Sequence, residues 1–85
     1  MKLSNQLIFL GQIVASFNVS VKDIRLSSIT EDQLIVRLDP KEYFRLFPKV
    51  EDSTEFQGNL GTDYTILKKG VVFTTYKHKK IRSLK

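Results

Sequence analysis

The chain has no cysteine, so it can form neither a disulfide nor a thiolate metal site. Its fold must rest on packing alone, which suits a reducing compartment such as the cytoplasm. It also lacks any run of about 20 consecutive apolar residues, the length that a membrane-spanning helix needs. With 85 residues, of which 41% are hydrophobic and 27% charged, the composition is typical of one small globular domain with a modest core.

The N-terminus has only a weak likeness to a secretory signal. Lys2 precedes apolar residues 7–15, but Gln12 interrupts that run and no small-residue cleavage site follows it. We therefore expect an uncleaved first helix, a cytoplasmic protein and no membrane partner.

Acidic side chains are missing from residues 68–85, which carry seven Lys and Arg. Residues 1–67 carry seven Lys and Arg against nine Asp and Glu, a net charge of −2. The net charge of +5 therefore comes entirely from the C-terminal segment at +7. Such a segment attracts phosphate groups or an acidic protein surface.

Recognisable catalytic groups are also missing. The single histidine, His78, lies among lysines that lower its pKa by repulsion, and no carboxylate is placed to orient it. The glycines of residues 58–61 lack the lysine and the helix start of a phosphate-binding loop. The acid pairs at 31–32 and 51–52 are adjacent residues of polar turns, which are normally solvated. The sequence predicts no enzyme, no cofactor, no metal site and no small-molecule substrate.

Residues 3–17 have the spacing of an amphipathic helix. Ser4 can cap its start, and apolar residues recur at steps of four, three, four and three: Leu3, Leu7, Leu10, Val14 and Phe17. Ile8, Phe9 and Ile13 lie off this stripe, so the helix is apolar over more than the roughly 100° that one core contact uses. Two interpretations stay open: a central helix gripped by a curved sheet, or a helix that also meets a second protein.

The next segments predict two strands and a short helix. Residues 19–28 alternate with a slip near Asp23, which indicates a bulge, and residues 34–38 alternate as a second strand paired antiparallel to the first. Asp39 as N-cap, Pro40 at the first helical position and Glu42 as capping-box partner predict a helix over 40–46. Pro48 ends it. We expect its aromatic residues to dock it on the sheet.

The last part of the core is predicted as a loop and a hairpin. Residues 49–63 form an acidic loop with one short strand near 54–57, and residues 64–81 form the hairpin. Because a two-residue turn would force Lys69 to positive φ, we expect a three-residue loop that places Leu67 opposite Val71 and Ile66 opposite Val72. Ile66 and Val72 would then share one face, and Leu67 and Val71 the other.

These elements predict an α+β fold in the order α-β-β-α-(β)-β-β. The N-terminal helix packs on an antiparallel sheet of four to five strands, and the short helix adds to the core. Residues 1–76 form a single compact domain, and residues 77–85 form a basic strand end and tail.

The function that this charge pattern favours is a non-enzymatic, regulatory binding protein. Its basic C-terminal hairpin would engage nucleic acid or another polyanionic partner, with Tyr76 stacking on unpaired bases, and with Tyr64 as a further candidate. The plain alternative is a lysine tail that serves only solubility. The candidate binding residues are Lys68, Lys69, Tyr76, Lys77, Lys79, Lys80 and Arg82.

A different class of function also fits the sequence. The chain could be a protein–protein interaction module, an inhibitor or an adaptor, that acts through its apolar first helix, by contact with an acidic protein surface, or by forming a homodimer. The candidate interface residues are Phe9, Ile13 and Phe17. Small size, local charge and the lack of catalytic groups would suit an accessory protein of a bacterium or phage.

Overall fold

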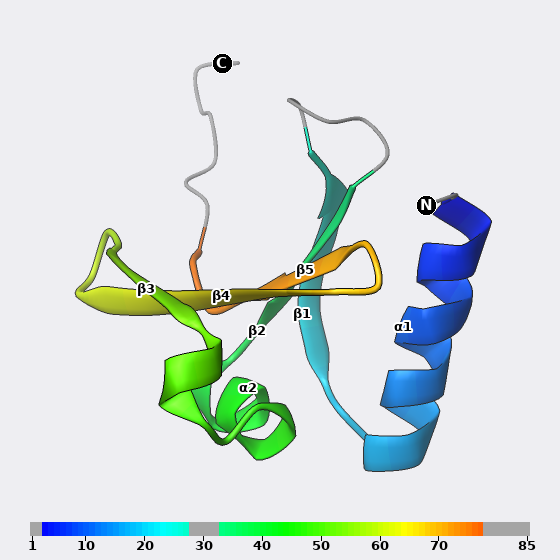
Figure 1. The fold of residues 1–85 in the computed structure, drawn as a ribbon, viewed down its shortest axis with the longest axis horizontal. Coiled ribbons are helices and arrows are strands. Elements are labelled where there is room, and N and C mark those ends of the chain that lie inside the picture. Colours follow the sequence, from blue (N-terminus) through cyan, green and yellow to red (C-terminus); the bar gives the residue numbers. More distant parts are fainter. Residues whose placement is uncertain (1–2, 28–32, 78–85) are drawn as a thin grey trace.

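The computed structural model describes residues 3–27 and 33–77 (Figure 1). The elements are α1 Leu3–Phe17, β1 Val21–Leu26, β2 Leu34–Leu38, α2 Pro40–Leu46, a 3-10 turn Val50–Asp52, β3 Thr54–Gln57, β4 Thr62–Lys68 and β5 Val71–Thr74. This confirms the α+β class and the predicted order, including the short strand at 54–57. Neither α1 nor α2 is long and apolar enough to cross a membrane.

The five strands form one mixed sheet in the order β1-β2-β5-β4-β3. Neighbouring strands are antiparallel except β2 and β5, which pair in parallel. The expectation of a wholly antiparallel sheet is therefore wrong at this one junction. The chain leaves β2 and passes through α2, β3 and β4, and it then returns in β5 beside β2. A crossover of this length, unlike a hairpin, allows the parallel direction.

The first helix and the bulge form as the sequence predicts. Asn18 ends α1 with φ at 54°, a conformation that asparagine tolerates better than most residues. In β1 the pairing register shifts between Val21 and Asp23, which is the predicted irregularity.

Helix α2 has the predicted bounds, but its predicted capping box is wrong. Asp39 is extended at the N-cap position and makes no side-chain cap hydrogen bond. Its carboxylate instead lies 3.5 Å from the Lys22 ammonium. Glu42 does not reach back to the cap, because its carboxylate accepts a hydrogen bond of 2.6 Å from Arg45. Both carboxylates thus pair with cations and do not form the predicted capping box.

The turn between β4 and β5 contains two residues, so the expected three-residue loop is wrong. Lys69 and Gly70 both have positive φ, at 49° and 81°. Lys68 therefore lies opposite Val71, and Ile66 lies opposite Phe73 instead of Val72. This register places Ile66, Val71 and Phe73 in the core, and their burial outweighs the roughly 1–2 kcal/mol that a left-handed lysine costs.

Both helices cover the same face of the sheet. The Phe73 ring, fully buried in β5, contacts Phe9 of α1 at 6.3 Å and Phe47 after α2 at 5.2 Å between ring centroids. Tyr43 is also fully buried, and its hydroxyl lies 2.6 Å from Ser53 Oγ. The remaining buried apolar residues come from α1, the sheet and the connection before β1: Leu10, Val19, Leu34, Val36, Leu38, Ile66 and Val71.

The buried side of α1 is rotated from the predicted stripe. Gln6 and Leu10 are the buried residues of the helix, and Phe9 and Ile13 pack against the core beside them. Gln6 Oε1 accepts a buried hydrogen bond of 3.0 Å from the backbone N–H of Leu34. This contact turns the helix so that part of the predicted stripe, Leu3, Leu7 and Phe17, remains exposed together with Ile8.

Candidate polyanion-binding surface

The face of the sheet opposite the helices, called here the open face, is covered by neither α1 nor α2. The strand pairing builds it from three cross-strand rows. One row is Arg25, Ile35, Val72 and Leu67. The next is Asp23, Arg37, Thr74, Thr65 and Thr54. The third, beyond the end of β5, holds Asp63 and Phe56 with the Tyr76 ring beside them.

The positive charges of the open face come from the outward positions of β1 and β2. Arg25 donates a hydrogen bond of 2.9 Å to Asp23, and this bond holds the pKa of the Asp23 carboxyl below its ordinary value. The charge of Arg37, directly across from Asp23 in the ladder, acts in the same direction. Arg37 itself makes no ion pair within 4 Å among residues 3–27 and 33–77.

A hollow of about 990 Å³ lies at one end of the open face. The outward positions of β1 and β2 form one wall, and the turn between β3 and β4 forms the other. Twelve residues line it: Lys22, Asp23, Arg25, Arg37, Asp39, Pro40, Asn59, Leu60, Thr62, Asp63, Thr75 and Lys77. Four cations against three acids give this lining a net charge of +1. Its volume is at the upper end of the roughly 300–1,000 Å³ typical of small-ligand sites.

Short polar contacts fix the β3–β4 wall. The Asp63 carboxylate accepts a hydrogen bond of 2.6 Å from Thr75, and the Asn59 side chain donates one of 3.1 Å to the carbonyl of Lys77. A Cβ at Gly58 would collide with the Asp63 carboxylate, so a larger residue there would displace this carboxylate from its hydrogen bond with Thr75. These contacts tie the residues after β5 to the turn, so Lys77 is held on the rim of the hollow.

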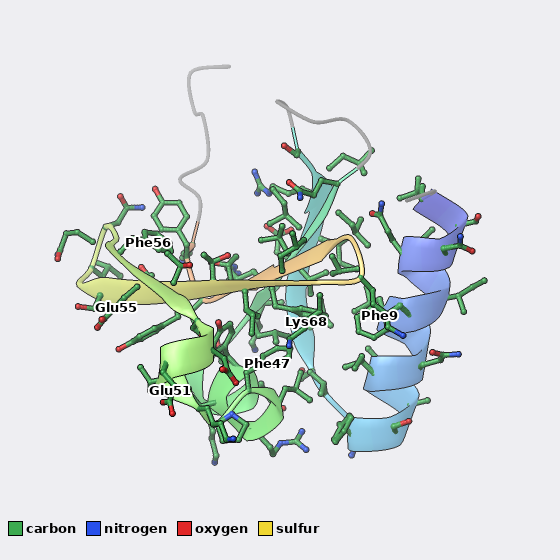
Figure 2. All side chains as sticks on the ribbon, viewed as in Figure 1. Phe9, Phe47, Glu51, Glu55, Phe56 and Lys68 are labelled. Atoms are coloured by element: carbon green, nitrogen blue, oxygen red, sulfur yellow. The ribbon has the colours of Figure 1, made fainter. Side chains whose placement is uncertain are left out.

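Two aromatic rings lie beside the hollow. Phe56 and Tyr76 are both half-buried, and their ring centroids are 5.6 Å apart. Figure 2 shows Phe56 on one side of β3 and β4, and Phe47 on the other side with α2. Tyr64, the other tyrosine considered for base stacking, packs on the helix-covered face against Phe44, with ring centroids 4.8 Å apart. It is therefore part of the domain packing and not of the open face.

The structure does not gather the predicted binding residues into one patch. Lys68 and Lys69 lie at the β4–β5 turn, where the Lys69 ammonium is 5.6 Å from the centroid of the Phe9 ring. Tyr76 and Lys77 follow the other end of β5, roughly 20 Å away at the usual rise per strand residue. The remaining predicted residues, Lys79, Lys80 and Arg82, and the histidine His78 lie outside the described part of the chain.

Sequence reasoning missed Arg25, Arg37, Asn59 and Phe56 as members of this surface. A signal for the arginines was present, because each stands between two apolar residues of a strand and therefore faces away from the core. No comparable signal marks Asn59 or Phe56. They join the surface only because β3 and β4 place them beside the end of β5.

The predicted interface residues of α1 divide into two groups. Phe9 and Ile13 are half-buried against the core from within the chain, whereas Phe17 is 48% exposed. Other apolar side chains are equally uncovered. Leu3 and Leu7 of α1 are 40% and 48% exposed, and Ile24 and Leu26 of β1 are 47% and 50% exposed.

Within residues 3–27 and 33–77, no group of three or more His, Cys, Asp or Glu is arranged to hold a metal ion. Comparison of the chain with protein-family models, with curated proteins and with solved structures finds no match.

Proposed function

We propose that this chain is a non-enzymatic, regulatory binding protein that engages nucleic acid through the end of β5 and the basic sequence that follows it. The observation that carries the proposal is the position of Lys77. It lies on the rim of the hollow that also contains Arg37, and the sequence after it continues with Lys79, Lys80, Arg82 and Lys85 and no acid. Lys77, the last described residue before this basic sequence, thus lies on a concave surface that has a positive net charge.

Phosphate contacts would supply most of the affinity. Each phosphate neutralised by Lys or Arg releases condensed counterions, so the binding constant falls steeply as salt rises. The absence of cysteine suits an action in the reducing cytoplasm.

The test is fluorescence anisotropy with labelled DNA and RNA across a salt series, using the full chain. Neutralising three cations together, Lys79→Gln, Lys80→Gln and Arg82→Gln, should weaken binding and reduce the slope of log K against log salt by about 2–3. The control, which neutralises two cations elsewhere, is Lys41→Gln with Lys49→Gln, two exposed lysines of α2 and the following loop. No binding at low salt, or equal loss in the control, would contradict the proposal.

A second candidate function is homodimerisation through α1 and β1. It is favoured by four half-exposed side chains, called here the apolar margin: Leu3, Leu7, Ile24 and Leu26. Gln6 bonds the start of α1 to Leu34, and Leu34 is the ladder partner of Leu26. The two parts of the margin therefore lie near the same end of the sheet, where a second copy can cover them.

Light scattering over a concentration series tests this candidate. If the chain dimerises, Leu7→Asp should give a folded monomer, since Leu7 is already 48% exposed within the chain. Ser16→Asp, an exposed polar position of the same helix, should leave the dimer intact. A monomer at every concentration would remove the candidate.

A further inference from the structure

We infer that the open face binds single-stranded nucleic acid, with bases stacked at Phe56 and Tyr76 and phosphates held by Arg37 and Lys77. This inference rests on the proposed function and adds the strandedness of the target and the residues that read it. It depends on the described surface instead of the C-terminal tail.

The Phe56 and Tyr76 rings lie beside the cations of the hollow. Phe56 lies directly opposite Asp63 in the β3–β4 ladder, and Asp63 lines the hollow together with Arg37 and Lys77. Aromatic rings beside a positive groove are the combination that binds unpaired bases, because every base has a face that can stack. A solvated lysine tail alone has no such rings.

The cations of the hollow differ in whether they already have a carboxylate partner. Lys22 and Arg25 already have carboxylate partners, Asp39 and Asp23, at 3.5 and 2.9 Å. Arg37 makes no ion pair among the described residues, and Arg is suited to bidentate phosphate contacts. The open face therefore offers Arg37 of β2 as a cation without an ion pair among the described residues, with Lys77 on the rim of the same hollow.

Duplex DNA fits the open face less well than single strands. Sequence-reading proteins insert a helix or a two-stranded ribbon into the major groove, which is about 12 Å wide. Both helices of this chain pack on the other face of the sheet, through Phe9 and Phe47 against Phe73. The open face is instead hollowed at the end where the β3–β4 turn rises, and unpaired bases can enter such a hollow.

The polar groups of that turn give the hollow its means of contacting base edges. Thr62 and Asn59 line the hollow, and the Asp63–Thr75 hydrogen bond connects this wall to the residues after β5. Polar groups already positioned beside the Phe56 and Tyr76 rings lower the ordering cost of binding a base.

The experiment compares labelled oligo-dT and oligo-U with a DNA hairpin duplex of equal phosphate number, at one fixed low salt concentration. The full chain should bind the single strands at least tenfold more tightly than the duplex. Phe56→Leu should weaken single-strand binding by roughly 5- to 150-fold, the equivalent of one lost base stack, whereas Phe56→Tyr should retain it. Arg37→Gln should also weaken it, and Lys41→Gln should not.

Each outcome has a clear meaning. Equal or tighter duplex binding, or single-strand binding unchanged in both Phe56→Leu and Arg37→Gln, overturns the inference. If those variants bind normally but neutralising Lys79, Lys80 and Arg82 abolishes binding, the proposed function stands and the inference fails. If no oligonucleotide binds the full chain, both fail. Circular dichroism confirms that each variant is folded, and Arg37→Gln provides the answer should Phe56→Leu unfold.

Discussion

Lys69 occupies a backbone conformation that costs a residue with a Cβ roughly 1–2 kcal/mol. Its φ is 49°, and the contact of its ammonium with the Phe9 ring, at 5.6 Å, returns only about 0.5–1 kcal/mol at an exposed site. Lys69→Asn should therefore raise the free energy of unfolding by roughly 0.5 kcal/mol, because asparagine tolerates this conformation. Urea denaturation measures the gain. Lys68→Asn, at the preceding strand position, should give none, and an equal gain there would contradict the explanation.

Tyr43 makes the stability of the folded state depend on pH, and this stability falls as pH rises. Burial raises the pKa of its hydroxyl above the ordinary value of about 10, and the hydrogen bond with Ser53 opposes that shift only in part. Above pH 10 the unfolded chain loses this proton while the folded chain keeps it, so the folded state becomes less stable as pH rises. Tyr43→Phe should lose less stability than the parent chain between pH 9 and 11, measured by urea denaturation. Parallel curves for the two proteins would show that Tyr43 makes no such contribution.

At the scale of elements, local patterns predict the helices and strands well but do not predict their contacts. Asn18, Pro40 and Pro48 mark helix ends through their own backbone preferences, so α1 and α2 have the expected bounds. The prediction of a capping box was wrong because both acids pair with cations: Lys22 attracts Asp39 only once the chain has folded, and Arg45 attracts Glu42 from one turn further along the same helix. The prediction of the turn at Lys69 was wrong for a related reason. The register of the β4–β5 hairpin is set by the residues that the core buries.

The orientation of α1 depends on Gln6. A prediction from the spacing of apolar residues does not take this polar residue into account. It is 1% exposed and accepts the backbone N–H of Leu34 across 3.0 Å. Gln6→Leu preserves size but leaves that buried donor unpaired, which should lower the free energy of unfolding by about 1–3 kcal/mol. Gln12→Leu is the matched control, because Gln12 is exposed on the same helix. Equal urea midpoints for the two variants would show that the buried hydrogen bond does not hold α1.

At the scale of the whole molecule, the parallel pairing of β2 with β5 could not be predicted from the sequence. Leu34 and Val71 are neighbours in the sheet, although most of the chain's second half separates them. The local sequence of each strand is consistent with a hairpin. The alternation of apolar and polar residues within a strand does not identify a distant partner strand. The same pairing brings Arg37 beside Thr74, and it thereby places the arginines of β1 and β2 on one surface with the end of β5. The open face is thus a product of topology, whereas the basic tail is visible in composition alone.

Phe73 packs where the sheet meets both helices. It lies in β5 between Val36 of β2 and Ile66 of β4, is fully buried, and contacts aromatic rings at both helices. Phe73→Ala should cost about 3–5 kcal/mol, a large part of the roughly 4–13 kcal/mol available to a domain of this size. Thermal unfolding followed by circular dichroism should show the helix and sheet signals lost together, at a much lower temperature than in the parent chain. Leu67→Ala, on the opposite face of the same hairpin and 58% exposed, should cost roughly 0.5 kcal/mol. If α1 instead stayed folded in Phe73→Ala while the sheet melted, Phe73 would stabilise the sheet alone and not the joint between the sheet and both helices.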